Sequence, residues 1–162
     1  KYKWMEIGLN HYSELLRYIK QLLDSDPLVN TVTQGDFDKV DLDKMNIYPL
    51  THIYIGDGSF SNGQTINFNV SIGAMSIRDI NDEVNDDKFW RNDNEVDNYN
   101  EMLAVLNRLW TKMYIDFEDA DIIATENPNL LKRSQDRDKN KLEGWQLEFQ
   151  VSMPNSTLSL CQ

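Results

Sequence analysis

The chain has 162 residues, 40% of them hydrophobic and 10% aromatic, which is enough to bury the core of one ordinary domain. Its 27 acidic residues outnumber 16 basic ones, and the net charge of −11 disfavours general nucleic-acid binding, because phosphate affinity depends on clustered Lys and Arg. The apolar runs are too short to cross a bilayer, and a lone cysteine, Cys161, is typical of a cytoplasmic chain. We expect a single domain over residues 1–162, with loose or contact-making arms at 1–9 and 155–162.

The first predicted element is an amphipathic helix from about Asn10 to Asp24. Asn10 is a suitable N-cap, and Pro27 prevents the helix from continuing far. The apolar residues at helical spacing are Tyr12, Leu15, Leu16, Ile19, Leu22 and Leu23.

The pattern is weaker from Val29 to Tyr48. Leu28, Val29 and Val32 favour a short strand. The alternating acids that follow, Asp36, Asp38, Asp41 and Asp43, lack the ligand order, central Gly and terminal Glu of an EF-hand. A solvated loop or sheet edge is therefore expected there in preference to a calcium site.

A pair of strands comes next. Ile53 and Ile55 alternate with polar neighbours, and a second alternating series begins at about Gln64 with Ile66, Phe68, Val70 and Ile72. The apolar positions then change parity to Met75 and Ile77, which predicts a β-bulge at Gly73-Ala74 inside one long strand ending at Ile77. The Gly- and Ser-rich stretch 56–63 is interpreted as a mobile finger with an exposed Phe60.

The segment from Asp79 to Asp97 contains eight acids, two bases and the pair Phe89-Trp90. One interpretation is a solvated strap that a single hydrophobic anchor holds in place. The other is a docking element whose aromatic side chains enter a neighbouring subunit.

A second helix is predicted from about Asn98 to Phe117, because Asn98 and Glu101 have the spacing of a capping box. Its apolar stripe, more typical of a core than of a cofactor pocket, comprises Tyr99, Met102, Leu103, Leu106, Leu109, Trp110, Met113 and Phe117.

The remainder is a second β unit. A strand is expected over Asp121–Glu126, and a clear alternating strand follows Gly144 from Trp145 to Met153, where Pro154 ends it. Between them lies the one basic stretch of the chain, formed by Lys132, Arg133, Arg137, Lys139 and Lys141. Because helices and strands do not alternate regularly, we expect an α+β fold, in which a mostly antiparallel sheet carries two amphipathic helices packed on one face.

Catalytic motifs are absent from the sequence. The two histidines, His11 and His52, lie in no recognisable catalytic neighbourhood, and with one cysteine they cannot close a zinc site. Phosphate-binding loops and nucleophile elbows are also missing. We therefore expect a protein that is not an enzyme and that holds no metal or cofactor. A hydrolase that uses two of the many carboxylates stays open, since a sequence cannot place two acids at a catalytic distance.

Three short motifs carry a resemblance. They are Leu22-Leu23-Asp24-Ser25-Asp26-Pro27-Leu28-Val29 after the first helix, Ile47-Tyr48-Pro49 before the first long strand, and Leu142-Glu143-Gly144-Trp145 with Met153-Pro154-Asn155 and Cys161 at the end. In these motifs and in the order of elements the chain resembles the tail-terminator or tail-completion (neck) proteins of long-tailed bacteriophages. Residues 35–46 and 121–141 match no part of that pattern.

The resemblance implies a structural virion protein, assembled in the host cytoplasm, that forms a ring, typically a hexamer, at the head-proximal end of the tail. Such a ring stops growth of the tail tube and joins the tail to the head. Its partners would be further copies of itself, tail-tube proteins and neck or connector proteins, with DNA only passing through the lumen and no membrane involved.

A ring requires two different patches that meet, and the acidic and basic segments are complementary candidates. The candidate interface residues are Phe60, Phe89, Trp90, Asp86, Asp87, Asp93, Lys132, Arg133, Arg137, Lys139 and Lys141. Alternatively, these segments face solvent or each other within one chain. The rival functions are a head–tail connector or other neck ring, and an acidic module that mimics DNA and binds a host protein.

Overall fold

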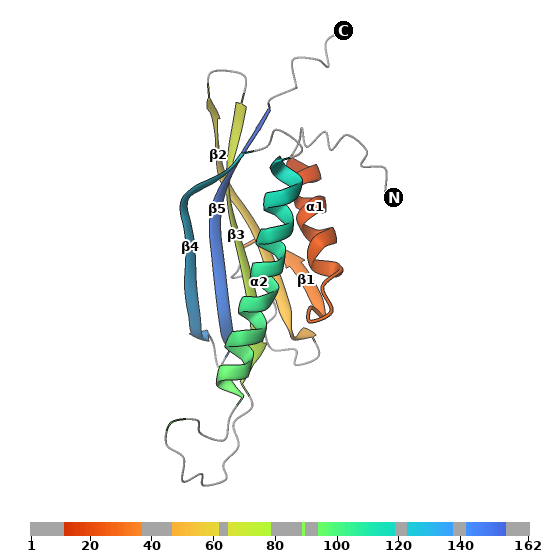
Figure 1. Cartoon of the computed structure of the whole chain (residues 1–162), viewed down its shortest axis with the longest axis vertical. Coiled ribbons are helices and arrows are strands. Elements are labelled where there is room, and N and C mark those ends of the chain that lie inside the picture. The colour runs from red at the N-terminus through yellow and green to blue at the C-terminus, as the bar shows by residue number, and fades with distance from the viewer. Residues whose placement is uncertain are drawn as a thin grey trace.

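A computed structural model describes residues 12–36, 47–61, 65–78, 89, 94–118, 123–137 and 142–154, with the side chains of β4 described only at 130–133. Two helices, α1 (Tyr12–Asp24) and α2 (Glu95–Glu118), cover one face of a five-stranded sheet (Figure 1). The strands are β1 (Thr31–Gln34), β2 (Leu50–Ser61), β3 (Thr65–Ile77), β4 (Ile123–Arg137) and β5 (Leu142–Pro154). The predicted α+β class with both helices on one face is therefore confirmed.

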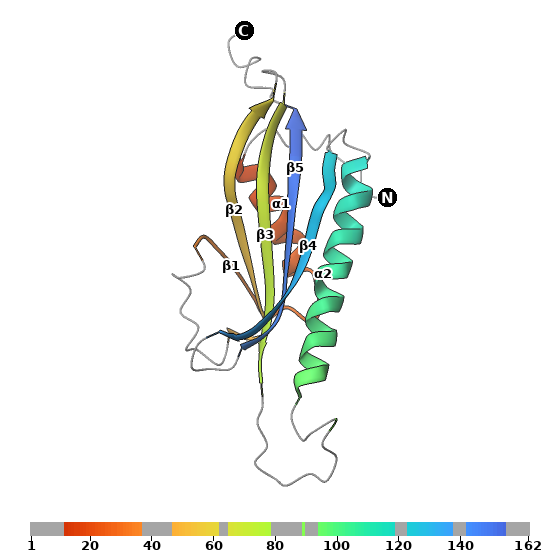
Figure 2. The same ribbon diagram turned by 90° about the vertical axis from the view of Figure 1, so that its left-hand side faces the viewer.

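The strand order is β1-β2-β3-β5-β4, so β1 and β4 form the two outer edges (Figure 2). The sheet is mostly antiparallel, as expected, but β1 runs parallel to β2. A parallel pair requires a crossover connection, and residues 35–49 separate these two strands in the chain.

The predicted first helix is confirmed from Tyr12 onward, whereas its expected cap Asn10 lies outside the described residues. Leu15, Ile19 and Leu23, at spacings of four residues, are its fully buried positions. After the helix, the Asp26 carboxylate accepts a hydrogen bond from the Leu28 N–H at 3.0 Å, an Asx-type turn that directs the chain toward β1.

The predicted bulge at Gly73-Ala74 is wrong. β3 pairs with β5 without interruption from Thr65↔Pro154 to Ile77↔Leu142, and its pairing with β2 is equally regular around Gly73. The apolar parity changes for a different reason: at this end the second face of the sheet is buried too, with Leu50 and Met75 paired across the strands and 0% and 2% exposed. Met75 is therefore an ordinary position whose side chain packs on the second face.

The irregularity lies in β2 instead, where the register shifts between Ile55 and Gly58. The stretch that was interpreted as a finger continues as strand to Ser61, so that prediction is corrected as far as the described residues reach. Backbone pairing with β3 explains the difference, because the ladder stabilises a Gly-rich segment that has little strand propensity of its own.

The second helix begins three residues earlier than predicted. The Asn98 N–H donates to the Asn94 carbonyl at 2.9 Å, which makes Asn98 an internal helical residue and corrects its assignment as the N-cap. Glu95 and Asp97 occupy the first turn, where carboxylates favour the helix dipole. The Asn98 side chain, 4% exposed, instead donates to the Ile77 carbonyl at 3.0 Å and ties the helix to the end of β3.

The strand expected over Asp121–Glu126 is part of a longer one, because β4 continues through the basic stretch to Arg137. Its pairing with β5 shifts between Thr125 and Leu130. Pro128 falls in that shift, and an edge strand tolerates a residue that lacks an N–H. The strand predicted after Gly144 is confirmed and begins slightly earlier, at Leu142.

The main core lies between the helices and the sheet. Its largest members include Phe117 and Met113 of α2 and Phe149 of β5, with Trp110 packed edge-on against Phe149 at 5.3 Å between ring centroids. Neither described helix has the length and apolar character that crossing a membrane requires.

Candidate assembly surfaces

Two of the predicted aromatic anchors are exposed. Phe60, near the end of β2, is 73% exposed, and Phe89 is 80% exposed. Their partner candidates Trp90, Asp86, Asp87 and Asp93 lie outside the described residues. Exposure of this size is compatible with a docking role and does not identify the surface on which either ring would dock.

The basic stretch lies mainly along β4. Lys132 forms an ion pair with Glu148 of the neighbouring strand at 2.8 Å, and Arg133 forms one with Glu95 of α2, also at 2.8 Å. Glu95 belongs to the acid-rich segment 79–97, so the two segments contact each other within one chain at this point. The Arg137 side chain, Lys139 and Lys141 lie outside what the structure describes.

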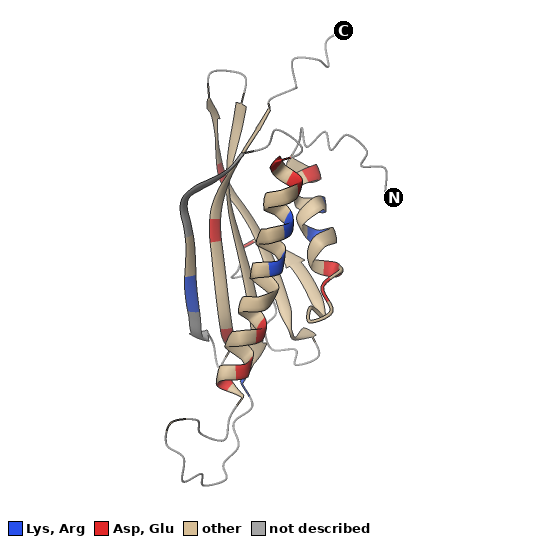
Figure 3. Cartoon of the chain, in the orientation of Figure 1, with Lys and Arg blue, Asp and Glu red and all other residues tan. Residues whose placement is uncertain are grey.

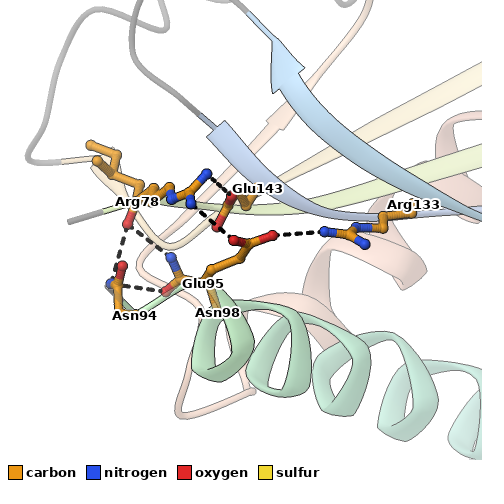
Figure 4. A network of polar contacts seen from close by, with 7 residues as sticks. Arg78, Asn94, Glu95, Asn98, Arg133 and Glu143 are labelled. Atoms are coloured by element: carbon orange, nitrogen blue, oxygen red, sulfur yellow. Dashed lines mark hydrogen bonds and ion pairs between the residues drawn. The ribbon is translucent and has the colours of Figure 1, made fainter. Parts of the chain in front are cut away.

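A polar network joins the start of α2 to the ends of β3 and β5 (Figure 4). Arg78 lies between two carboxylates, donating to Glu95 at 2.9 Å and pairing with Glu143 at 3.2 Å. The other oxygen of Glu95 accepts from Arg133, so one carboxylate bridges two guanidinium groups. Asn94 and Asn98 complete the network at the Ile77 carbonyl. Because Glu143 is 0% exposed, we interpret the network as a structural contact that holds the start of α2 against β3 and β5.

The same guanidinium of Arg133 also lies over the Tyr99 ring, 4.1 Å from its centroid. Burial raises the pKa of the Tyr99 hydroxyl, although the hydrogen bond with Arg133 acts in the opposite direction. The Tyr99 carbonyl accepts from the Trp145 indole at 2.9 Å, so α2 and β5 are joined on the helix face of the sheet.

The outer strand β4 and the C-terminal half of α2 each carry two exposed apolar side chains. Leu130 and Leu131 on β4 are 42% and 41% exposed, and Tyr114 and Ile115 on α2 are 49% and 52% exposed. Leu130 and Leu131 are neighbours on β4 and project to opposite faces of the sheet, and we call these two residues the β4-edge patch.

The opposite edge, formed by α1 and β1, contains a groove of about 330 Å³. Its apolar lining comes from Tyr12, Leu16, Val32 and Ile53, and its polar lining comes from Ser13, Arg17, Lys20, Thr33 and Gln34. We call it the α1–β1 groove.

Arg17 differs from the other basic side chains that the structure describes, because it makes no ion pair with any described residue. The other described bases are all paired: Lys20 with Asp24, Arg78 with Glu95 and Glu143, Arg108 with Asp26, Lys112 with Asp116, Lys132 with Glu148 and Arg133 with Glu95. Figure 3 shows how these basic positions are distributed over the two helices and β4.

A second cavity, of about 240 Å³, lies between the two helices and includes Asp26 and Arg108 in its lining. Burial raises the pKa of the Asp26 carboxyl, but hydrogen bonds from Arg108 and from the Leu28 N–H outweigh this effect and hold the pKa below its usual range. The ion pair therefore links α1 to α2 and leaves little unused charge in that cavity.

Tyr18 is partly buried and His52 is fully buried, and both make side-chain hydrogen bonds. The Tyr18 hydroxyl donates to Asp116 at 2.8 Å, and burial, with that carboxylate's hydrogen bond and charge, raises the pKa of Tyr18. His52, 0% exposed, lies 2.8 Å from the Thr33 hydroxyl and 2.6 Å from the Gly35 carbonyl. Through these contacts it links β2 to the β1 edge.

The second face of the sheet carries neither of the described helices (Figures 1 and 2), and several of its side chains are amides and hydroxyls. Gln146 donates to Ser71 at 2.7 Å, and Gln150 donates to Asn69 at 3.4 Å. Lys132 and Glu148, which lie on this face, form an ion pair, so their charges neutralise each other. The described part of this face therefore combines polar groups with the exposed Tyr54 and Leu130 and carries one neutralised ion pair.

Within the described ranges, no group of three or more His, Cys, Asp and Glu side chains is placed to hold a metal ion. Comparison with models of known protein families gave no match, and comparison with curated proteins gave none either.

The sequence analysis did not single out Arg17 among the polar residues of the first helix. No sequence signal could have done so, because its significance depends on which carboxylates surround it in space. The burial of Glu143 and its ion pair with Arg78 were also not predicted, because nothing in the sequence around Gly144-Trp145 indicates them.

Proposed function

We propose that this chain is a structural subunit that assembles with copies of itself into a ring, in the role of the phage tail-terminator or tail-completion proteins that its sequence resembles. In that role it is a virion protein that acts without catalysis. The ring would cap the head-proximal end of the tail tube and join the tail to the head. The α+β fold with both helices on one face agrees with what the resemblance implies.

The observation that carries the proposal is the difference between the two edges of the sheet. One edge presents the apolar β4-edge patch, and the other presents the α1–β1 groove with a cation that has no described ion-pair partner. Surfaces that differ in this way suit a head-to-tail contact between copies, and such a contact closes into a ring when the rotation permits.

The composition of the second face of the sheet supports the passage of DNA. A channel wall of amides, hydroxyls and a self-neutralised ion pair offers no concentration of cations to hold phosphates. If this face lines the lumen, DNA would move past it without sticking.

The rival interpretation, an acidic module that mimics DNA, needs an array of available carboxylates. Several described carboxylates are instead paired within the chain, among them Asp26, Asp116, Glu95, Glu143 and Glu148. This arrangement favours the assembly role over mimicry of a phosphate backbone.

The test is the mass of the full chain by native mass spectrometry and analytical ultracentrifugation, with electron microscopy of the particles. We expect a closed ring, six copies being the expected number. The double variant Leu130→Lys with Leu131→Lys should weaken assembly at least tenfold, because charge replaces apolar area in the contact. Val96→Lys is the matched control, since Val96 is 43% exposed at the other end of α2, and it should assemble normally.

A chain that stays monomeric at every concentration, alone and with tail tubes, would refute the proposal. A ring of twelve that binds the head side would favour the connector alternative. A ring that halts the elongation of purified tail tubes supports the terminator role directly.

A further inference from the structure

The α1–β1 groove combines three features on one edge of the sheet. Its lining includes apolar side chains from both elements, namely Leu16 of α1 with Val32 and the nearly inaccessible Ile53 of the strands. Arg17 is part of the polar lining and makes no ion pair among the described residues. The outer edge of β1 lies alongside.

No described strand pairs with the outer side of β1, so this edge can accept a further strand. The Thr31 N–H donates to the Pro49 carbonyl and the Gly35 N–H donates to the Ile53 carbonyl, so the odd-numbered residues of β1 are directed toward β2. The alternation of a strand then directs the backbone N–H and C=O groups of Val32 and Gln34 outward, away from β2. An extended segment lying there would gain backbone hydrogen bonds, as in strand addition at a sheet edge.

The chemistry of the groove selects an acidic segment with an aromatic anchor. An unpaired guanidinium gains most from a carboxylate, with which it can form a two-pronged contact. A groove of about 330 Å³ with a partly apolar lining has room for an aromatic side chain, the kind of anchor that supplies much of the binding energy at protein interfaces.

The chain itself contains a segment of this composition. Residues 79–93 carry six acids, Asp79, Asp82, Glu83, Asp86, Asp87 and Asp93, around the pair Phe89-Trp90. Phe89 is 80% exposed, so it is not inserted into the groove of its own chain. Of the five cations first considered for this segment, the two whose side chains are described, Lys132 and Arg133, already have carboxylate partners within the chain. Among the described side chains, Arg17 is then the cation without an ion pair.

We infer that the α1–β1 groove of one copy binds the acid-rich segment 79–93 of a second copy, with an aromatic side chain in the cavity and carboxylates on Arg17. This inference rests on the proposed ring and names one contact within it. It assigns the acidic segment to a different partner surface from the basic stretch of β4.

The first experiment uses a labelled synthetic peptide of residues 79–93 and the full-length protein, with affinity read by fluorescence anisotropy. Arg17→Glu should weaken binding at least tenfold. The control variant Gln21→Glu with Asn107→Glu changes the net charge by the same amount at exposed helix positions outside the groove lining, and it should bind like the wild type. A peptide with Phe89→Ser and Trp90→Ser should also bind at least tenfold more weakly.

The second experiment distinguishes contact between copies from contact within one chain. Copies labelled with ¹⁴N and ¹⁵N are mixed, and a carbodiimide links the Lys20 amine at the groove to nearby carboxylates. We expect mixed-isotope peptides that join Lys20 to residues 79–93. Links found only within single-isotope chains would overturn the inference, as would equal peptide binding by the wild type and Arg17→Glu.

The outcomes separate this inference from the proposed function. A ring that forms equally well with Arg17→Glu refutes the groove contact and leaves the ring intact. A wild-type chain that never assembles refutes both. Loss of assembly in Arg17→Glu, restored by Asp86→Lys with Asp87→Lys in the same chain, supports both.

Discussion

Gly144 marks the closest approach of β5 to β3. A Cβ at this position would lie 1.9 Å from the Ala74 carbonyl oxygen and 2.9 Å from the Met75 Cα. Both atoms belong to the backbone of the paired strand, so neither can move without disturbing the ladder between the two central strands.

We therefore predict that Gly144→Ala lowers the free energy of unfolding by about 3 kcal/mol, because the backbone of β3 or β5 must shift to admit the methyl group. Gly56→Ala is the matched control, since its Cβ would meet the Tyr54 ring at 3.0 Å, and that exposed side chain can turn away. Its cost should stay within about 1 kcal/mol. Urea denaturation of both variants checks this, and equal losses would contradict the close-approach argument.

His52 gives the fold a predictable dependence on pH. The Gly35 carbonyl can only accept, so Nε2 carries the hydrogen, and Nδ1 of the neutral ring accepts from Thr33. Burial lowers the pKa of His52 below its ordinary 6.5, although the Gly35 carbonyl and the charge of Asp36 act in the opposite direction. The unfolded chain therefore binds the proton more readily than the folded one.

The stability that comes from a neutral His52 is complete above pH 6.5 and declines as the pH falls from there through the folded-state pKa. We predict that unfolding free energies measured between pH 8 and pH 5 decrease below pH 6.5, and that His52→Gln flattens this decrease. Imidazole NMR shifts that titrate at or above 6.5 would disprove the prediction.

At the scale of elements, the start of α2 depends on Arg78. This residue is 12% exposed and neutralises two carboxylates, one of which, Glu143, is fully buried. Removal of the cation leaves Glu143 charged in an environment where water cannot compensate.

Arg78→Met should therefore lower the free energy of unfolding by about 3–5 kcal/mol. Lys20→Met removes an ion pair whose side chains are 54% and 47% exposed, and it should cost about 0–1 kcal/mol. Denaturant titration compares the two variants, and combining Arg78→Met with Glu143→Gln should recover part of the loss. If the double variant were no more stable than Arg78→Met, the buried carboxylate would not be the cause.

The sequence predicted best those elements whose apolar residues repeat because a single face is buried. α1 and β5 each bury one face, so their apolar residues repeat at the period of their own geometry. β3 buries one face along most of its length and both faces near Met75, and the resulting change of parity resembled a bulge. β4 was missed beyond Glu126 because pairing at a sheet edge tolerates bases and proline that local propensity disfavours.

At the scale of the whole molecule, the sequence indicated which kinds of side chain are available for contacts but not which residues they contact in the folded chain. The exposure of Phe60 was predicted from its Gly- and Ser-rich surroundings and is confirmed, whereas the sequence left open whether Phe89 is an anchor of its own chain or a docking group. The intramolecular pairs of Lys132 and Arg133, and the absence of a described partner for Arg17, depend on neighbours that are distant in the chain. Long-range placement of this kind leaves no local pattern in a single sequence.

The uninterrupted pairing of β3 sets the order in which parts of the molecule open to solvent. β3 pairs with β5 along its whole length and with β2 along most of it, whereas β1 and β4 each have a partner on one side. Amide hydrogens of β3 should accordingly exchange with deuterium last, through near-global unfolding, and those at the outer edges first. The two edges on which assembly is proposed are then also the parts of the sheet that loosen most readily, so that binding at either edge should slow their exchange before it affects the centre.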